Sequence, residues 1–379
     1  MSIKISSGFD AGAIEIVSAT SAGAIDLNIR KDSNADIIQW FYYRLQGGRD
    51  QPCSMRLLNA GASAYPDGWN DYRAMASYDR VHWFRVPTTF DGQVLTIAHT
   101  PEADSVYYAY FEPYSWERHL ELLDRAQLSE HVRLLDLGCS VDGRDINALV
   151  IGDPAAAKKV WVIARQHPGE TMAEWFVEGM LDALLDPSDP FGRQLLKQAV
   201  FYVVPNMNPD GAVRGNLRTN AAGANLNREW NTPTMERSPE VFVVKQKIQE
   251  TGCDLFLDVH GDEALPYVFV AGSSALPNFS EAQRAQEKTF SDAFKVASPD
   301  FQDEHGYGEA PYTDETLTMG SPHITHLFGC LSLTLELPFK DNANDPDELS
   351  GWDGARSARL GAAVLQAVLQ PILQALLEG

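Results

Sequence analysis

The sequence predicts an α/β domain preceded by an antiparallel β-sandwich domain. The first third of the chain is rich in short aromatic or β-branched runs, whereas apolar strands alternate with helical segments in the remainder. A chain of 379 residues is also longer than a typical domain with one hydrophobic core, so two domains are expected. We place the boundary after residue 114, so that residues 1–114 form the β domain and residues 115–379 the α/β domain.

The predicted strands of the first domain are short and are separated by glycine, proline and aspartate. They are the runs IIQWFYYRL, MRLLNAG, VHWFRVP, QVLTIAHT and VYYAYFE. Several short strands at close spacing are typical of an antiparallel sandwich. Residues 112–130 then predict a helix, because Trp116, Leu120 and Leu123 recur at helical spacing.

The predicted strands of the second domain are longer and more apolar. They are INALVIG, KVWVIARQ, AVFYVVPN, CDLFLDVHG, YVFVAG and CLSLTLELP, and helices are expected over residues 171–185, 241–251, 281–296 and 356–379. Strands that alternate with helices indicate a sheet covered on both faces.

The charge and composition of the chain exclude several classes of partner. The formal net charge of −22 repels phosphate backbones and anionic lipid surfaces, so we expect no nucleic-acid partner and no membrane association. No apolar run reaches the roughly 20 residues that span a bilayer, and no leader peptide is recognised. We therefore expect a cytoplasmic protein, and buried free thiols at Cys53, Cys139, Cys253 and Cys330 rather than a cysteine metal site.

The motif HPGE lies where a predicted strand meets a predicted helix. Pro168 favours an extended His167 at the tip of the strand, with Glu170 in the first helical turn. An imidazole and a carboxylate could there converge on a metal ion such as zinc. On its spacing alone the motif fits a helix-capping glutamate beside an exposed histidine better than a metal site.

A third metal ligand would have to come from a distant part of the chain. His260 ends the apolar strand CDLFLDVHG, at the edge where open α/β sheets build their sites. Two histidines and one glutamate leave the fourth position of a zinc ion open, as catalysis requires. Asp258 could contact a metal-binding residue and hold it in place, although an ordinary pairing with another residue in the core or on the surface explains Asp258 equally well.

Two further stretches carry candidate catalytic groups. Residues 205–231 form a long loop rich in Asn, Gly and Arg, which is either a plain surface loop or a site in which Arg218 and Arg228 bind a carboxylate or an oxyanion. In CLSLTLELPF, alternation places Glu336 opposite the leucine face near the end of a very apolar strand. Glu336 is either a solvent-facing carboxylate or a general base with a raised pKa.

Taken together, these residues resemble the zinc metallocarboxypeptidase family, and within it the cytosolic carboxypeptidase subfamily. The blocks ARQHPGETMAEW, NMNPDG, LNREW, LDVHG and TLELPF occur in the order of that subfamily, and the likeness runs from about Gln39 to Lys340. The resemblance implies the zinc-carboxypeptidase fold, a mixed central sheet flanked by helices, behind a β-sandwich. It also implies one zinc ion per chain.

The resemblance assigns a role to each candidate residue. Zinc would be held by His167, Glu170 and His260, and Glu336 would be the base that deprotonates the metal-activated water. Arg218 would polarise the scissile carbonyl, while Asn227 and Arg228 would hold the C-terminal carboxylate of the substrate. The substrate-contacting tyrosine of the family is assigned to Tyr312 in preference to Tyr307.

The resemblance implies hydrolysis of the C-terminal peptide bond of peptides or proteins, or of an isopeptide-linked glutamate. Glutamate preference is only a hypothesis for this chain, because no Lys or Arg occurs between Lys295 and Lys340, a region that instead contains Asp303, Glu304, Glu309, Asp314 and Glu315. One alternative is a zinc amidohydrolase that deacylates a small N-acyl amino acid. Another is an inactive peptide-binding protein. The oligomeric state is not predicted.

Overall fold

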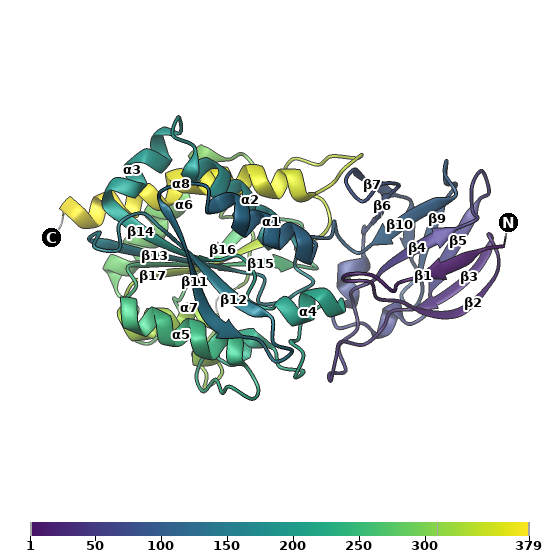
Figure 1. The fold of residues 1–379 in the computed structure, drawn as a ribbon, viewed down its shortest axis with the longest axis horizontal. Helices are drawn as coiled ribbons and strands as arrows, with labels where there is room; N and C mark the ends of the chain where they lie inside the picture. Colours follow the sequence, from purple (N-terminus) through teal and green to yellow (C-terminus); the bar gives the residue numbers. More distant parts are fainter. Residues whose placement is uncertain (1, 309, 378–379) are drawn as a thin grey trace.

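The computed structural model describes residues 2–308 and 310–377, without the side chains of residues 376 and 377; Glu309 lies outside this part of the chain. Figure 1 shows two lobes side by side along the long axis, with the N-terminal third of the chain in one lobe and the remainder in the other.

The N-terminal lobe consists of two five-stranded sheets. The first has the order β1 (Lys4–Ser6), β4 (Tyr42–Gln46), β10 (Ser105–Ala109), β6 (Ala74–Ser77), β7 (Trp83–Val86). The second has the order β2 (Glu15–Ser21), β3 (Ala24–Asn28), β5 (Cys53–Leu57), β9 (Leu95–His99), β8 (Thr88–Phe90). All pairs are antiparallel except β3 with β5, which are parallel. The predicted β-sandwich is therefore confirmed, with one parallel pair that the sequence pattern did not indicate.

The second lobe is built on a seven-stranded mixed sheet. Its order is β11 (Val132–Cys139), β12 (Asp145–Ile151), β14 (Ala199–Val204), β13 (Lys158–Ala164), β15 (Leu255–Asp262), β17 (Leu331–Pro338), β16 (Phe269–Ala271). The four strands from β14 to β17 in this order are mutually parallel. Their side chains are almost all buried, because helices cover both faces of the sheet.

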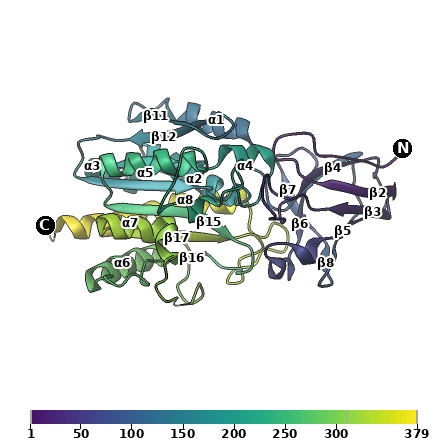
Figure 2. The same ribbon diagram turned by 90° about the horizontal axis from the view of Figure 1, so that it is seen from below.

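Helices cover the two faces of this sheet, as Figures 1 and 2 show. One face carries α2 (Met172–Leu185), α3 (Pro190–Gln198), α6 (Glu281–Ala297) and α8 (Gly354–Leu377), with α1 (Trp116–Ala126) beside α2. The opposite face carries α5 (Pro239–Thr251) and α7 (Gly320–Phe328), and the short α4 (Pro209–Arg214) lies toward the N-terminal lobe. Single 3₁₀ turns occupy η1 (Ala60–Ala62), η2 (Pro66–Trp69), η3 (Leu226–Arg228) and η4 (Thr316–Thr318). The predicted α/β architecture is confirmed.

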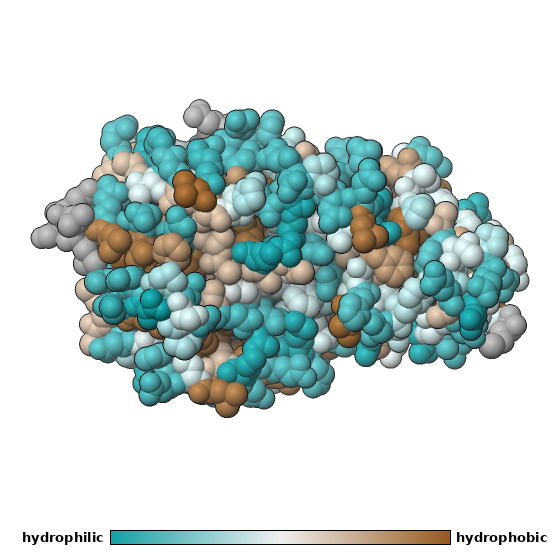
Figure 3. Space-filling view, turned by 90° about the horizontal axis from the view of Figure 1, so that it is seen from above, coloured by the Kyte–Doolittle hydropathy of each residue, from teal (hydrophilic) through white to brown (hydrophobic). Residues whose placement is uncertain are grey.

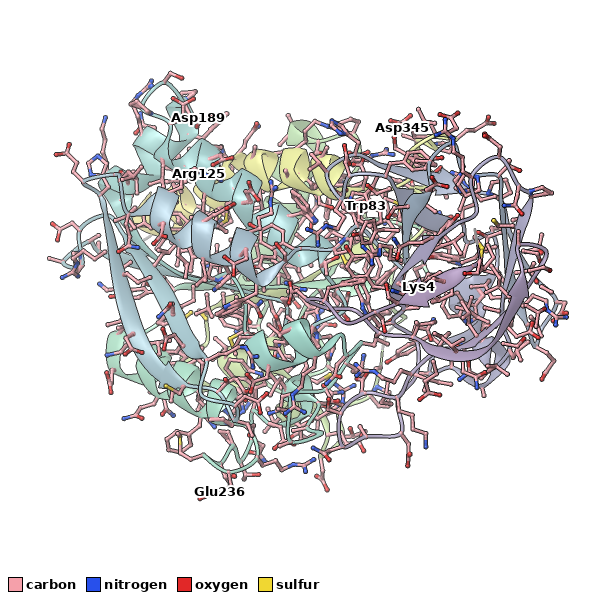
Figure 4. All side chains as sticks on the ribbon, turned by 45° about the vertical axis from the view of Figure 1, so that its right-hand side comes forward. Lys4, Trp83, Arg125, Asp189, Glu236 and Asp345 are labelled. Atoms are coloured by element: carbon pink, nitrogen blue, oxygen red, sulfur yellow. The ribbon has the colours of Figure 1, made fainter. Side chains whose placement is uncertain are left out.

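A buried arginine joins the two lobes. Arg85 of β7 donates hydrogen bonds to the carbonyl oxygens of Phe339 and Trp352, each at 2.8 Å. These carbonyls bound the loop that contains Asp345, which Figure 4 labels together with Trp83 of β7, and the Arg85 amide donates to the Leu349 carbonyl of the same loop at 3.1 Å. Because the Arg85 guanidinium is buried, its hydrogen bonds to two carbonyls hold the lobes together at this point.

The surface is predominantly polar. Figure 3 shows hydrophilic residues over most of one face, with small separate apolar patches. Among the described residues, no helix has the length and apolar character needed to cross a membrane. Cys53, Cys253 and Cys330 are buried free thiols, whereas Cys139 is exposed at the end of the edge strand β11, contrary to expectation.

Candidate active site

The HPGE motif forms a turn that precedes helix α2 instead of capping it. Strand β13 ends at Ala164, and Arg165 takes a left-handed conformation with φ of 60° that turns the chain. The sequence predicted Glu170 in the first turn of the helix. The helix has Thr171 as its N-cap, so Glu170 lies just before the helix and that prediction is wrong. The Glu170 carboxylate contacts two histidines, which excludes the capping interpretation.

The side chains of His167, Glu170 and His260 converge at one buried point. Glu170 Oε1 lies 2.7 Å from His167 Nδ1, and Glu170 Oε2 lies 2.8 Å from His260 Nδ1. The two imidazole Nδ1 atoms are 3.2 Å apart. The structure therefore brings together the three residues that the sequence selected, although 90 residues separate Glu170 from His260.

Oxygen atoms behind the histidines orient both rings. His167 Nε2 lies 3.0 Å from Asn225 Oδ1, and His260 Nε2 lies 3.0 Å from Asp258 Oδ1. Asn225 Oδ1 also accepts the Asn227 amide hydrogen, which identifies that atom as the oxygen. The Asn225 oxygen favours the His167 proton on Nε2 and leaves the Nδ1 lone pair of that ring directed at Glu170, while the Asp258 carboxylate is a close charged neighbour of His260 Nε2.

A chain of buried hydrogen bonds holds Asp258 in place. Gln166 Nε2 donates to Asp258 Oδ2 at 2.7 Å, and Trp230 Nε1 donates to Gln166 Oε1 at 2.9 Å. Asp258 and Gln166 are both fully buried. The orientation of His260 is thus supported through two further layers of side chains.

The electrostatics of the three residues match a cation site. Burial lowers the pKa of His167 to about 4, with a further contribution from Arg218. Burial alone would raise the pKa of Glu170, but the two imidazoles outweigh it and lower that pKa. For His260, Asp258 and Glu170 outweigh burial and raise the pKa of the ring. His167 is thus kept neutral, as a metal ligand must be, whereas the carboxylates of Glu170 and Asp258 favour positive charge beside His260, which a divalent metal ion would supply.

Glu336 lies beside this cluster on the neighbouring strand. It is directly opposite His260 in the parallel pairing of β15 with β17 and is 5% exposed, so the solvent-facing interpretation is wrong. Burial, followed by the charge of Glu170, raises its pKa to about 8. Glu336 Oε1 accepts a hydrogen bond from the Tyr307 hydroxyl at 3.0 Å, while Oε2 has no hydrogen-bond partner among the described residues.

The two candidate tyrosines lie in different settings. The Tyr307 hydroxyl contacts Asp262 Oδ2 at 2.8 Å in addition to Glu336, and its ring packs edge-on against Phe269. Tyr312 is 43% exposed, and its hydroxyl has no hydrogen bond to another residue that the structure describes. The assignment of Tyr312 stays a prediction, and Tyr307 is the tyrosine that contacts the candidate base.

Arg218 and Arg228 lie near each other and near the metal-binding cluster. Neither guanidinium has a carboxylate within 4.0 Å in the described part of the chain, and burial together with Arg218 lowers the pKa of Arg228. Asn227 Oδ1 accepts the Gly320 amide hydrogen at 2.8 Å, which leaves the amide NH₂ group as its free donor. The loop therefore presents unneutralised donors, as a carboxylate site requires.

Sequence reasoning did not identify Asn225, Tyr65 or Glu263 as site residues. Asn225 is only two residues from Asn227, so its place in the block LNREW could have suggested it. Tyr65 comes from the N-terminal lobe, and its ring centroid lies 5.4 Å from the Arg218 guanidinium. Glu263 is buried, with a pKa that burial and Glu170 raise, and no local pattern marks either residue.

Comparison with known proteins shows which family shares this arrangement. Residues 119–349 match the model of the zinc carboxypeptidase family, and residues 5–111 match that of the cytosolic carboxypeptidase N-terminal domain. A metallo-carboxypeptidase structure from Burkholderia cenocepacia is 57% identical, with a TM-score of 0.96 over 99% of this chain and 100% of that one. A metallo-carboxypeptidase from Pseudomonas aeruginosa, solved in complex with (2-guanidinoethylmercapto)succinic acid, is 44% identical, with a TM-score of 0.94 over 97% and 100% of the two chains. Human cytosolic carboxypeptidase 2 is 30% identical over 70% of this chain, which spans only 33% of that relative.

Proposed function

Because the chain belongs to the zinc carboxypeptidase family, we propose that it hydrolyses the C-terminal peptide bond of peptides or proteins at the site formed by His167, Glu170 and His260. The chain is a metallocarboxypeptidase. The observation that carries the specific proposal is the convergence of three side chains that could hold a metal ion. They lie next to a buried carboxylate and to two guanidinium groups that have no carboxylate partner among the described residues. We further propose a cytoplasmic location, by likeness to the cytosolic carboxypeptidases.

The residues at the site fit one zinc ion. Two imidazole Nδ1 atoms and one carboxylate point at a common centre, and this donor set of two nitrogens and one oxygen is one that zinc prefers. When bound, zinc would act as a Lewis acid toward the scissile carbonyl and lower the pKa of a water ligand. Asn225 and Asp258 would keep the two rings in the ligating orientation.

Glu336 is proposed as the general base and acid. Its Oε2 is buried and has no partner in the described part of the chain, so this atom would be available to take a proton from the attacking water. The same carboxyl group would then pass that proton to the departing amine. The Tyr307 hydroxyl at Oε1 would hold the carboxylate plane in place during both transfers.

Arg228, Asn227 and Arg218 are proposed as the groups that position the substrate. The Arg228 guanidinium and the Asn227 amide would bind the C-terminal carboxylate, which restricts hydrolysis to the last peptide bond. Arg218 would stabilise negative charge that develops on the carbonyl oxygen. The pKa of Arg228 is lowered partly by Arg218, so an anion between the two cations would relieve their repulsion.

The domain boundary after residue 114 remains our proposal. Helix α1 begins at Trp116, and the two family models end at residue 111 and begin at residue 119. The N-terminal sandwich and the carboxypeptidase domain would then be 1–114 and 115–379.

The proposal also includes a preference for the side chain of the released C-terminal residue. Asp262 contacts Tyr307, which neighbours the proposed base, and the charge of Glu315 acts on the proposed anchor Arg228. Residues 296–339 offer no Lys or Arg to neutralise an acidic side chain. We expect C-terminal glutamate to be released more slowly than neutral residues.

A peptide library with varied C-terminal residues, analysed by mass spectrometry, tests the proposal. The zinc-loaded enzyme should remove single C-terminal residues, and a chelator or Glu336→Gln should abolish cleavage. Glu304→Gln, at an exposed carboxylate, is the matched control and should leave the rates unchanged. Cleavage that persists in both the chelator and the Glu336→Gln samples would contradict the mechanism. Hydrolysis of N-acyl amino acids without peptide cleavage would favour the deacylase alternative, whereas glutamate released fastest would contradict only the side-chain preference.

A further inference from the structure

The backbone around Arg218 wraps a carboxylate from the N-terminal lobe. The Leu217 amide donates to Asp32 Oδ1 at 2.7 Å. The Arg218 and Thr219 amides donate to Asp32 Oδ2 at 2.8 and 3.0 Å, and the Thr219 hydroxyl donates to the same oxygen at 3.2 Å. Asp32 is 5% exposed, so these hydrogen bonds are shielded from water. Three consecutive amides bound to one carboxylate fix the path of the chain at Arg218.

Further contacts press this loop against the same lobe. The Ser33 amide donates to Asn216 Oδ1 at 3.0 Å, and Asn34 Nδ2 donates to the Ala221 carbonyl at 2.8 Å. Gly223 has φ of 80°, and a Cβ atom there would lie 2.2 Å from the Asn34 carbonyl oxygen. The loop therefore packs closely against the N-terminal lobe, and these hydrogen bonds hold it there.

The N-terminal lobe also contacts the other end of the Arg218 side chain. The guanidinium lies over the Tyr65 ring at 5.4 Å from its centroid, within the range of a cation–π interaction. Tyr65 is itself held by buried Gln39, which accepts the Tyr65 amide hydrogen at 3.0 Å and donates to the Tyr65 carbonyl at 3.2 Å. Arg218 is thus held at its backbone by Asp32 and at its guanidinium by Tyr65.

We infer that the N-terminal β domain contributes two positioning residues to the active site. Asp32 and Tyr65 hold the Arg218 guanidinium toward the carbonyl group of the substrate. This inference rests on the role proposed above for Arg218. Both residues lie in the N-terminal third of the chain, and neither is one of the three proposed zinc-binding residues. Substitution of Asp32 or Tyr65 should therefore slow the catalytic step in which Arg218 takes part and should leave the affinity for zinc unchanged.

Steady-state kinetics of the full-length, zinc-loaded enzyme tests this inference. Asp32→Asn and Tyr65→Leu should each lower kcat about tenfold or more, because a misplaced catalytic group can cost up to about 100-fold. KM should change little, since Asn227 and Arg228 are untouched. Tyr65→Phe keeps the aromatic face and should retain wild-type kcat. Asp36→Asn, at an exposed carboxylate of the same domain paired with Lys31, is the matched control and should have no effect.

Double variants separate positioning from general damage to the fold. In the Arg218→Ala background, Asp32→Asn and Tyr65→Leu should each change kcat by less than about threefold, because the group they position is absent. The same fold-loss in both backgrounds would overturn the inference, as would unchanged kcat in the two single variants. If Arg218→Ala itself retains full kcat, the proposed role of Arg218 fails, and the inference fails with it. If Asp32→Asn does not fold, the Tyr65 pair and its double variants decide the outcome.

Discussion

A buried glutamate next to the arginine loop should make folding stability depend on pH. Glu240 lies in the first turn of α5 and is fully buried. Its Oε2 accepts a hydrogen bond from Asn220 at 3.1 Å, and its Oε1 has no partner among the described residues. Burial raises the pKa of Glu240 from 4.5 to about 7. The native protein therefore binds this proton more tightly than the unfolded chain does.

The size of the effect follows from the two pKa values. At about 1.4 kcal/mol for each pKa unit, ionised Glu240 costs the native state up to about 3.5 kcal/mol. The contribution of the protonated form is fully present below about pH 4.5 and is lost as the pH rises to about 7. Between about pH 5 and about pH 8, Glu240 should thus lower the free energy of unfolding by about 2.5 kcal/mol.

Glu240→Gln removes this dependence and keeps the size of the side chain. The difference in the free energy of unfolding between the variant and the wild type should be about 2.5 kcal/mol more favourable to the variant at about pH 8 than at about pH 5. Urea unfolding followed by tryptophan fluorescence measures the difference at each pH, with other titrating groups common to both proteins. Glu250→Gln, on the half-exposed side of the same helix, is the matched control and should show no such change. A Glu240→Gln effect that is equal at the two pH values would refute the reasoning.

Three other predictions concern the active site. Asp258→Asn should weaken zinc binding about 10–100-fold, as measured by competition with a chelator, because Asp258 orients His260; unchanged affinity would contradict this role. Tyr307→Phe should lower kcat more than Tyr312→Phe, because only Tyr307 contacts Glu336; the reverse order would support the prediction made from the sequence. Arg228→Ala should raise KM about tenfold or more for peptides with a free C-terminus, and wild-type enzyme should bind amidated peptides about as weakly; equal KM values for free and amidated peptides would argue against the proposed anchor.

The strands that lead to the candidate site were predictable because they are buried on both faces. Strands β13, β15 and β17 appear as nearly continuous apolar runs, which end at or near His167, His260 and Glu336. Strand β11 was not predicted. It is an edge strand with many exposed side chains, so polar residues interrupt its pattern and weaken the local signal.

The sequence by itself determined the fold class and the three residues that the structure brings together as a metal-binding cluster, because buried strands and their polar ends leave a periodic local pattern. Only the tertiary structure decided that Glu170 stands before helix α2 and contacts two histidines, which excludes the capping interpretation. It also decided that Tyr307 rather than Tyr312 reaches Glu336, and that Asp32 and Tyr65 reach Arg218. These contacts join loops far apart in the chain, and loops have no periodicity from which their neighbours can be predicted.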